Sequence, residues 1–164
     1  QKPSSAASDV YKRQIIAKAS HHQACTDTLT LAFDLRQKAR LQATLDSGAE
    51  AGLFLPRGDI LRNGDVLKTE SGDFIQVIAA QEHVSTVRCQ DHHLFARACY
   101  HLGNRHVPLE INADYLRYQQ DHVLDDMLIG LGLQVNHEQA TFEPEAGAYT
   151  HSHHSHSEHA HKHE

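Results

Sequence analysis

The residues with the clearest chemical capability are histidines gathered at the C-terminal end of the chain. Residues 151–164 read HSHHSHSEHAHKHE, and half of these fourteen positions are histidine. They are His151, His153, His154, His156, His159, His161 and His163. Imidazole is the commonest protein ligand for borderline transition metals. The segment from residue 150 to residue 164 therefore indicates a metal-binding tail, although imidazole alone does not choose between nickel, zinc and copper.

The same segment lacks the apolar side chains that folding requires. Its largest aliphatic residue is Ala160, so it cannot bury enough apolar surface to offset the entropy cost of ordering. We expect a disordered tail. Two other interpretations stay open: an affinity tag, although tags are usually uninterrupted histidine runs, and a solvated, pH-responsive tail that holds no metal.

Length, net charge and cysteine content limit the kinds of protein that this chain can be. A chain of 164 residues holds one ordinary domain or two small ones. Its formal net charge of −6 argues against nucleic acid or an anionic membrane as a partner. The three cysteines, Cys25, Cys89 and Cys99, form no C-x-x-C pair, which fits a reducing compartment. With no long apolar run and no signal-peptide pattern, we expect a cytoplasmic protein.

The first half of the chain has the periodicity of strands. Residues 1–14 are polar, and we interpret them as a loose arm or a leftover of cloning or gene assembly. Within residues 15–82, apolar side chains alternate with polar ones at Leu29, Leu31, Phe33 and Leu35. Asn63-Gly64 predicts a hairpin and Gly72-Asp73 another turn. We expect a small all-β domain of about six strands, a sandwich or part-barrel, with a role in binding or support.

Helices enter only after residue 83. Asp91 is a suitable N-cap for a helix that Gly103 ends, and Asp121 is suited to cap a second helix. Strand patterns occupy residues 84–89, 107–111, 116–118 and 133–142. The resulting order βαββαβ predicts a ferredoxin-like domain over residues 83–149. The predicted fold class is therefore α+β: an all-β domain, a ferredoxin-like domain and the tail.

Three histidines of the second domain are candidate ligands: His101, His106 and His122. His106 stands where the first helix passes into a strand, so its ring should lie near the surface. A lone histidine is more often a surface or structural residue than a ligand. Two copies related by the two-fold axis of a homodimer, however, can hold one metal between them and leave open positions for the tail.

Three stretches resemble the urease accessory metallochaperone family, UreE. Residues 101–109 read HLGNRHVPL, residues 121–128 read DHVLDDML and residues 142–149 read FEPEAGAY, in the family's order and ahead of a histidine-rich tail. This resemblance covers residues 95–164. The β-rich part, including LPRG at residues 55–58, is similar with weaker signatures, and the first fourteen residues match nothing in the family.

The resemblance implies a cytoplasmic bacterial protein that binds Ni²⁺ and supplies it to apo-urease during active-site assembly. It also implies a homodimer formed by the ferredoxin-like domains, a β-domain that contacts proteins, and a partner GTPase, UreG. The family's interfacial nickel ligand falls on His106 and a peripheral ligand on His122. A second peripheral histidine of some members falls on Gln120, which should weaken that site. Zn²⁺ or Cu²⁺ can occupy the same ligands.

Other functions are weighed against this one. A metal buffer or storage protein without a urease client would use the same ligands. A metal-dependent hydrolase would need a preformed cluster such as H-E-x-x-H. The pair His92-His93 lacks that spacing, and Cys99 has no evident base beside it. Asp125 and Asp126 are better explained by helix-end electrostatics than by acid–base catalysis. We therefore expect no enzyme.

Overall fold

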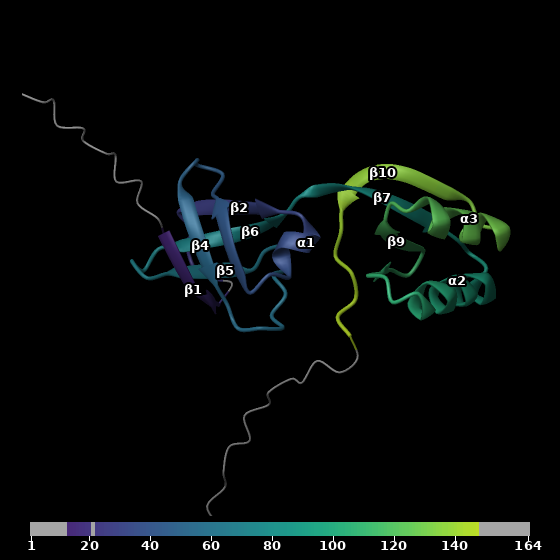
Figure 1. Cartoon of the computed structure of the whole chain (residues 1–164), viewed down its shortest axis with the longest axis horizontal. Helices are drawn as coiled ribbons and strands as arrows, with labels where there is room; N and C mark the ends of the chain where they lie inside the picture. The colour runs from purple at the N-terminus through teal and green to yellow at the C-terminus, as the bar shows by residue number, and fades with distance from the viewer. Residues whose placement is uncertain (1–12, 21, 148–164) are drawn as a thin grey trace, which may run out of the picture.

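The computed structural model describes residues 13–20 and 22–147, and its elements form two units side by side (Figure 1). The first unit is built from strands and the second from strands and two helices. A single residue, Ala80, connects the last strand of the first unit to the first strand of the second. None of the helices within the described residues is long and apolar enough to span a membrane.

The first unit is one six-stranded mixed sheet. Its strands are β1 (Arg13–Ala19), β2 (Asp27–Leu31), β3 (Arg40–Thr44), β4 (Glu50–Phe54), β5 (Val66–Thr69) and β6 (Phe74–Ala79). They lie in the order β2-β6-β5-β1-β4-β3. The pairs β1–β4 and β2–β6 are parallel, and the other neighbours are antiparallel. Ile15, Leu29, Leu67 and Ile75 are fully buried in its core.

The two edge strands of this sheet approach each other at one end. Asp46, which follows β3, donates its backbone N–H to the carbonyl of Thr28 in β2 at 2.9 Å. Its carboxylate accepts hydrogen bonds from the hydroxyls of Thr28 and Thr30. The six strands therefore form one continuous, curled sheet, as in a part-barrel.

The strand predicted through Leu35 ends earlier. β2 stops at Leu31, and residues Phe33–Arg36 form one helical turn, α1. Phe33 and Arg36 are both buried, with exposed fractions of 3% and 0%. Residues three apart share a face on a helix but lie on opposite faces of a strand. The helical turn is thus the conformation that buries both side chains.

Two further local predictions are corrected. Asn63-Gly64 forms a turn but no hairpin, because no strand precedes it within residues 55–62. Its polar groups bind β6 instead: Asn63 Oδ1 accepts from the backbone N–H of Ala79, and Gly64 donates to the carbonyl of Val77. In addition, β1 begins at Arg13, so the last two residues of the expected loose arm belong to the sheet.

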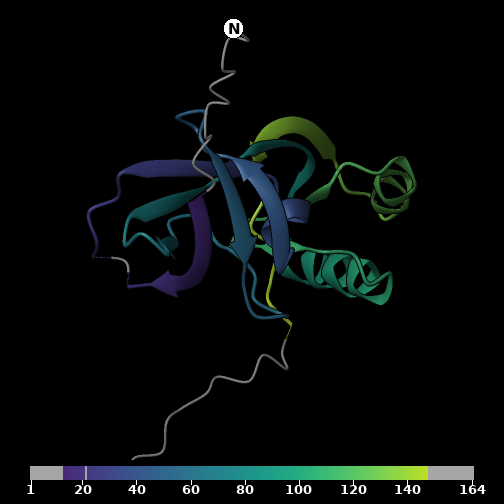
Figure 2. The same cartoon turned by 60° about the vertical axis from the view of Figure 1, so that its left-hand side comes forward.

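The second unit follows the order strand, helix, strand, strand, helix, strand. Its elements are β7 (Gln81–Arg88), α2 (His92–Asn104), β8 (Glu110–Ile111), β9 (Tyr115–Gln119), α3 (His122–Gly130) and β10 (Val135–Thr141). The strands form an antiparallel sheet in the order β10-β7-β9-β8. Both helices are seen beside this sheet in Figure 2. Leu102, Leu116, Tyr118 and Leu128 are fully buried between helices and sheet.

Both predicted helix starts are confirmed. The carboxylate of Asp91 accepts from the backbone N–H groups of His93 and Leu94, and that of Asp121 accepts from the two equivalent groups of α3. The predicted helix end is wrong. α2 continues through Gly103 to Asn104, and the residue with left-handed backbone is His106, at φ 56°.

Candidate metal centre

His106 occupies an exposed turn between α2 and β8. The backbone N–H groups of Arg105 and His106 donate to the carbonyls of Leu102 and Gly103, each at 3.0 Å, and so close the helix. Left-handed backbone is uncommon outside glycine, although histidine is among the residues enriched there. The turn therefore holds the imidazole at the surface, where a ligand from another segment or another chain can reach it.

His122 is the first residue of α3 and is also exposed. A cavity of about 280 Å³ is lined by residues next to His106 and by residues next to His122. Val107 and Pro108, next to His106, line one part of it, and Gln120 and Asp121, next to His122, line another. Sequence neighbours of both candidate positions thus line one hollow of the second unit.

The described residues of a single chain hold no preformed metal cage. Among residues 13–20 and 22–147, no group of three or more His, Cys, Asp or Glu side chains gathers in position to hold an ion. The tail ligands that the sequence predicts lie outside the described residues: His151, His153, His154, His156, His159, His161 and His163. A metal at His106 would need ligands from the tail, from a second chain or from solvent.

The segment that leads to the tail passes close to His106. After β10 the backbone N–H of Glu143 donates to the carboxylate of Glu110 at 2.9 Å. The N–H of Glu145 then donates to the carbonyl of Leu109 at 2.8 Å. Leu109 is three residues from His106, a path of at most about 11 Å along the chain. Residue 145 is therefore anchored beside the turn that presents the imidazole.

A buried arginine holds this returning segment. The Arg36 side chain is fully buried and donates to the carbonyls of Leu31 and Leu61, each at 3.1 Å. It also donates to the carbonyl of Phe142 and forms an ion pair with the Glu143 carboxylate. One guanidinium thus joins the first unit to residues 142–143, which follow the second.

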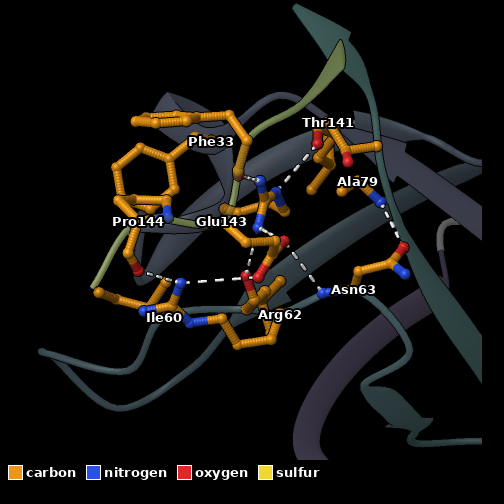
Figure 3. Close-up of polar contacts among 12 residues, drawn as sticks. Phe33, Ile60, Arg62, Asn63, Ala79, Thr141, Glu143 and Pro144 are labelled. Carbon is orange, nitrogen blue, oxygen red and sulfur yellow. Dashed lines mark hydrogen bonds and ion pairs between the residues drawn. The ribbon is translucent and has the colours of Figure 1, made fainter. Parts of the chain in front are cut away.

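Further contacts reinforce this attachment (Figure 3). Arg62 donates to the carbonyl of Pro144 at 2.6 Å, and its guanidinium lies 3.5 Å from the Glu143 carboxylate. The rings of Phe33 and Phe142 meet edge to face with centroids 5.5 Å apart. We call Arg36, Arg62 and Glu143 the C-terminal clamp. It holds residues 142–144 against the first unit.

A second polar network lies under α3, and the sequence did not indicate it. Tyr118 donates its hydroxyl to Asp125 at 2.6 Å, and Nε2 of His137 lies 2.7 Å from the same carboxylate. Burial alone would raise the pKa of Asp125, but these bonds outweigh it and hold that pKa below its usual range. Burial and the bond to Asp125 raise the pKa of Tyr118. Asp125 is therefore a buried network residue as well as a helix-end acid.

Comparison with known proteins covers both units. The model of the UreE urease accessory protein N-terminal domain matches residues 13–80, and that of its C-terminal domain matches residues 82–164. The urease accessory protein UreE of Pseudomonas putida (strain W619) is 64% identical over 125 residues, 76% of this chain and 78% of the relative. That of Alkalilimnicola ehrlichii is 62% identical over 122 residues, 74% and 75% of the two chains. That of Escherichia coli O157:H7 is 57% identical over 132 residues, 78% and 86%.

Proposed function

Because this chain belongs to the UreE family of urease accessory proteins, we propose that it is a nickel metallochaperone for urease maturation. It binds Ni²⁺ through His106 at a homodimer interface and through histidines of its tail, and it delivers the ion to apo-urease. His122 contributes a peripheral ligand. Zn²⁺ or Cu²⁺ can compete for the same imidazoles, since affinity rises along the divalent series. The role is accessory, so no catalytic residue is assigned.

The observation that carries the proposal is the path of the C-terminal segment. His106 is exposed in its turn, and Glu145 is bonded to Leu109 three residues away. The first tail histidine, His151, follows Glu145 by six residues, a reach of at most about 21 Å. A coil of the tail's fourteen residues spans about 20 Å on average. Tail imidazoles then have an effective concentration on the order of millimolar at His106.

This arrangement suits a protein that must release its cargo. Four fixed ligands in a closed cage would retain the ion, whereas two imidazoles, one from each chain, leave positions where other ligands exchange. Tail imidazoles complete the site while the ion is carried. They give way when a partner protein offers ligands of its own. Ligation requires neutral imidazole, so we expect the ion to be lost as the pH falls through about 6.

The proposal extends to architecture and partners. Residues 15–82 form the protein-binding β-domain and residues 83–149 the ferredoxin-like domain that dimerises and binds metal. The sheet order β10-β7-β9-β8 with two helices supports the ferredoxin-like assignment. Residues 150–164 form the metal-binding tail. The protein acts in the cytoplasm, with the urease apoprotein complex and the accessory GTPase UreG as partners.

Nickel titration of the wild type and of His106→Gly tests the interface site, with the oligomeric mass measured in parallel. Glycine removes the imidazole but keeps the left-handed backbone that this position requires. We expect the variant dimer to lose its tightest site, one ion per two chains, and to keep its mass. His92→Ala, a change at the exposed first residue of α2, is the control and should leave that site intact. A strictly monomeric protein with unchanged nickel affinity would refute the interface site.

A metal buffer without a urease client is the alternative function, since capture and delivery use the same ligands. The two differ in partners. A chaperone loaded with Ni²⁺ should bind apo-urease or the GTPase in a pull-down and raise urease activity in reconstitution. A buffer should bind neither and should lower activation by withholding the ion.

A further inference from the structure

Two histidines outside the predicted ligand set lie on the helix-facing side of the second sheet. They are His83 of β7 and His137 of β10. In the β7–β10 ladder His137 stands opposite Ser85, and Gln139 stands opposite His83. Opposite residues point to the same face, and residues two apart on a strand share it. His83 and His137 are therefore diagonal neighbours, with Cβ atoms about 7 Å apart.

His137 is held in the manner of a metal ligand. Its Nε2 lies 2.7 Å from the carboxylate of Asp125, which is 6% exposed and is itself fixed by the Tyr118 hydroxyl. Metal-binding histidines commonly donate one ring N–H to a carboxylate, which orients the ring and leaves the other nitrogen to the ion. The other nitrogen here, Nδ1, lies 3.3 Å from the Gln120 side-chain nitrogen. The His137 side chain is 52% exposed, so an ion has access.

Two glutamines, Gln139 and Gln120, flank the second histidine, His83. Gln139 places its side-chain nitrogen 2.9 Å from the His83 ring. On the other side of His83, Gln120 donates its backbone N–H to the His83 carbonyl at 3.2 Å, and its side chain reaches across to His137. The terminal torsion of a glutamine is broad and roughly two-fold. A half turn of either amide would present its oxygen in place of its nitrogen.

We propose that His83 and His137 form an auxiliary site for a borderline divalent cation such as Ni²⁺ or Zn²⁺. Nδ1 of His137 and one ring nitrogen of His83 are the imidazole ligands. The amide oxygens of Gln120 and Gln139 complete the set together with water, and Asp125 orients His137 from behind. Two neutral imidazoles and neutral amides make an open, exchangeable site. It is separate from His106, and it stands or falls independently of the urease role.

Residue-by-residue modification of the full-length chain tests this site. Diethyl pyrocarbonate modifies free imidazole, and mass spectrometry of peptides reports each histidine separately. With increasing Ni²⁺ we expect His83 and His137 to become protected together, at one midpoint and by at least about three-fold. Asp125→Asn should raise the Ni²⁺ concentration at this midpoint by about 10–100-fold, because losing such a carboxylate usually weakens metal binding by that factor.

Substitution of the partner histidine supplies a variant that leaves the core intact. His83→Gln changes an exposed side chain and should abolish the protection of His137. His93→Gln, an equally exposed histidine on the first turn of α2, is the matched control and should leave it unchanged. Equal modification of His83 and His137 with and without Ni²⁺ would overturn the site, even if the tail and His106 were protected. Protection of His137 that survives His83→Gln but is lost in His122→Gln would overturn the pairing.

Discussion

His106 combines an exposed imidazole with a left-handed backbone conformation. Its φ of 56° lies in the region that residues other than Gly, Asn, Asp and His rarely enter. The sequence suggested Gly103 as the residue that ends the helix, because glycine most often takes the left-handed position. Gly103 instead stays within α2. The turn thus places a histidine at the left-handed position that glycine most often takes.

This backbone requirement gives a stability prediction. His106→Ala should be about 1 kcal/mol less stable than His106→Gly, because a Cβ without polar compensation disfavours left-handed backbone. Gly103→Ala is the control: its Cβ would meet no atom within 4 Å, and alanine favours helix by about 0.5–1 kcal/mol. Urea denaturation of the three variants measures the differences. Equal stability of the alanine and glycine variants at 106 would contradict the account.

The sequence predicts His106, His122 and the tail histidines as ligands, but it indicates neither His83 nor the network around His137. The caps Asp91 and Asp121 could be predicted because a cap bonds to backbone only two and three residues ahead. The pair Asp125–His137 could not, since its members are twelve residues apart on a helix and a strand that only the tertiary fold brings together. In the sequence, His137 is one of four consecutive polar residues, 136–139.

Among elements, the closure of the first sheet includes the carboxylate of Asp46. Asp46 binds Thr28 and Thr30 of β2, and these hydroxyls hold its pKa below the usual range. A carboxylate with a depressed folded pKa contributes stability above its unfolded pKa of about 3.9 and loses it as the pH falls through the folded value. The contribution should therefore be complete at neutral pH and vanish below about pH 4.

The double variant Thr28→Val, Thr30→Val checks this assignment. Valine keeps the strand but removes both donors. Since Asp46 is exposed and screened by solvent, we expect a loss of only about 0.5 kcal/mol at pH 7. The difference from the wild type should shrink towards zero as the pH falls below about 4 in urea denaturation. A difference that stays constant across this range would exclude Asp46 as its source.

The sequence could not predict that α1 would contact residues 142–143, which follow β10. The alternation through Leu35 suggested a strand, since Phe33 and Leu35 fit its period. The conformation was decided by Arg36, whose burial requires acceptors that lie far away along the chain, at Leu61 and Phe142. Local pattern carries no information about such acceptors.

Arg36→Met should be strongly destabilising. It leaves the carboxylate of Glu143 without its buried partner and strips donors from three carbonyls, so we expect a loss of about 3–5 kcal/mol in the free energy of unfolding. Arg88→Met, at an arginine whose side chain is 58% exposed, is the control and should cost less than about 1 kcal/mol. Thermal unfolding compares them. Similar midpoints for the two variants would show that the clamp adds little.

At the scale of the whole molecule, we expect different residues to determine the stability of the fold and the number of Ni²⁺ ions bound. The core residues of both units lie within residues 15–142, and the seven tail histidines lie beyond residue 150. Deleting residues 151–164 should therefore lower the number of Ni²⁺ ions bound per chain and leave the unfolding midpoint within about 1 °C. Calorimetric titration and thermal unfolding of the same sample measure both. Unchanged stoichiometry would end the idea that the tail is a reservoir.

The two halves of the molecule are held together by more than the linking residue Ala80. Ala80 alone joins β6 to β7, and its N–H is bonded to the carbonyl of Leu31 at 3.0 Å. The chain then comes back through Phe142 and Glu143 to the same region of the first unit. This second attachment opposes a hinge rotation of the two units, because moving them apart would break the contacts of Arg36 with Phe142 and Glu143. A protease cut at Ala80 would accordingly leave the fragments associated until a denaturant parted them.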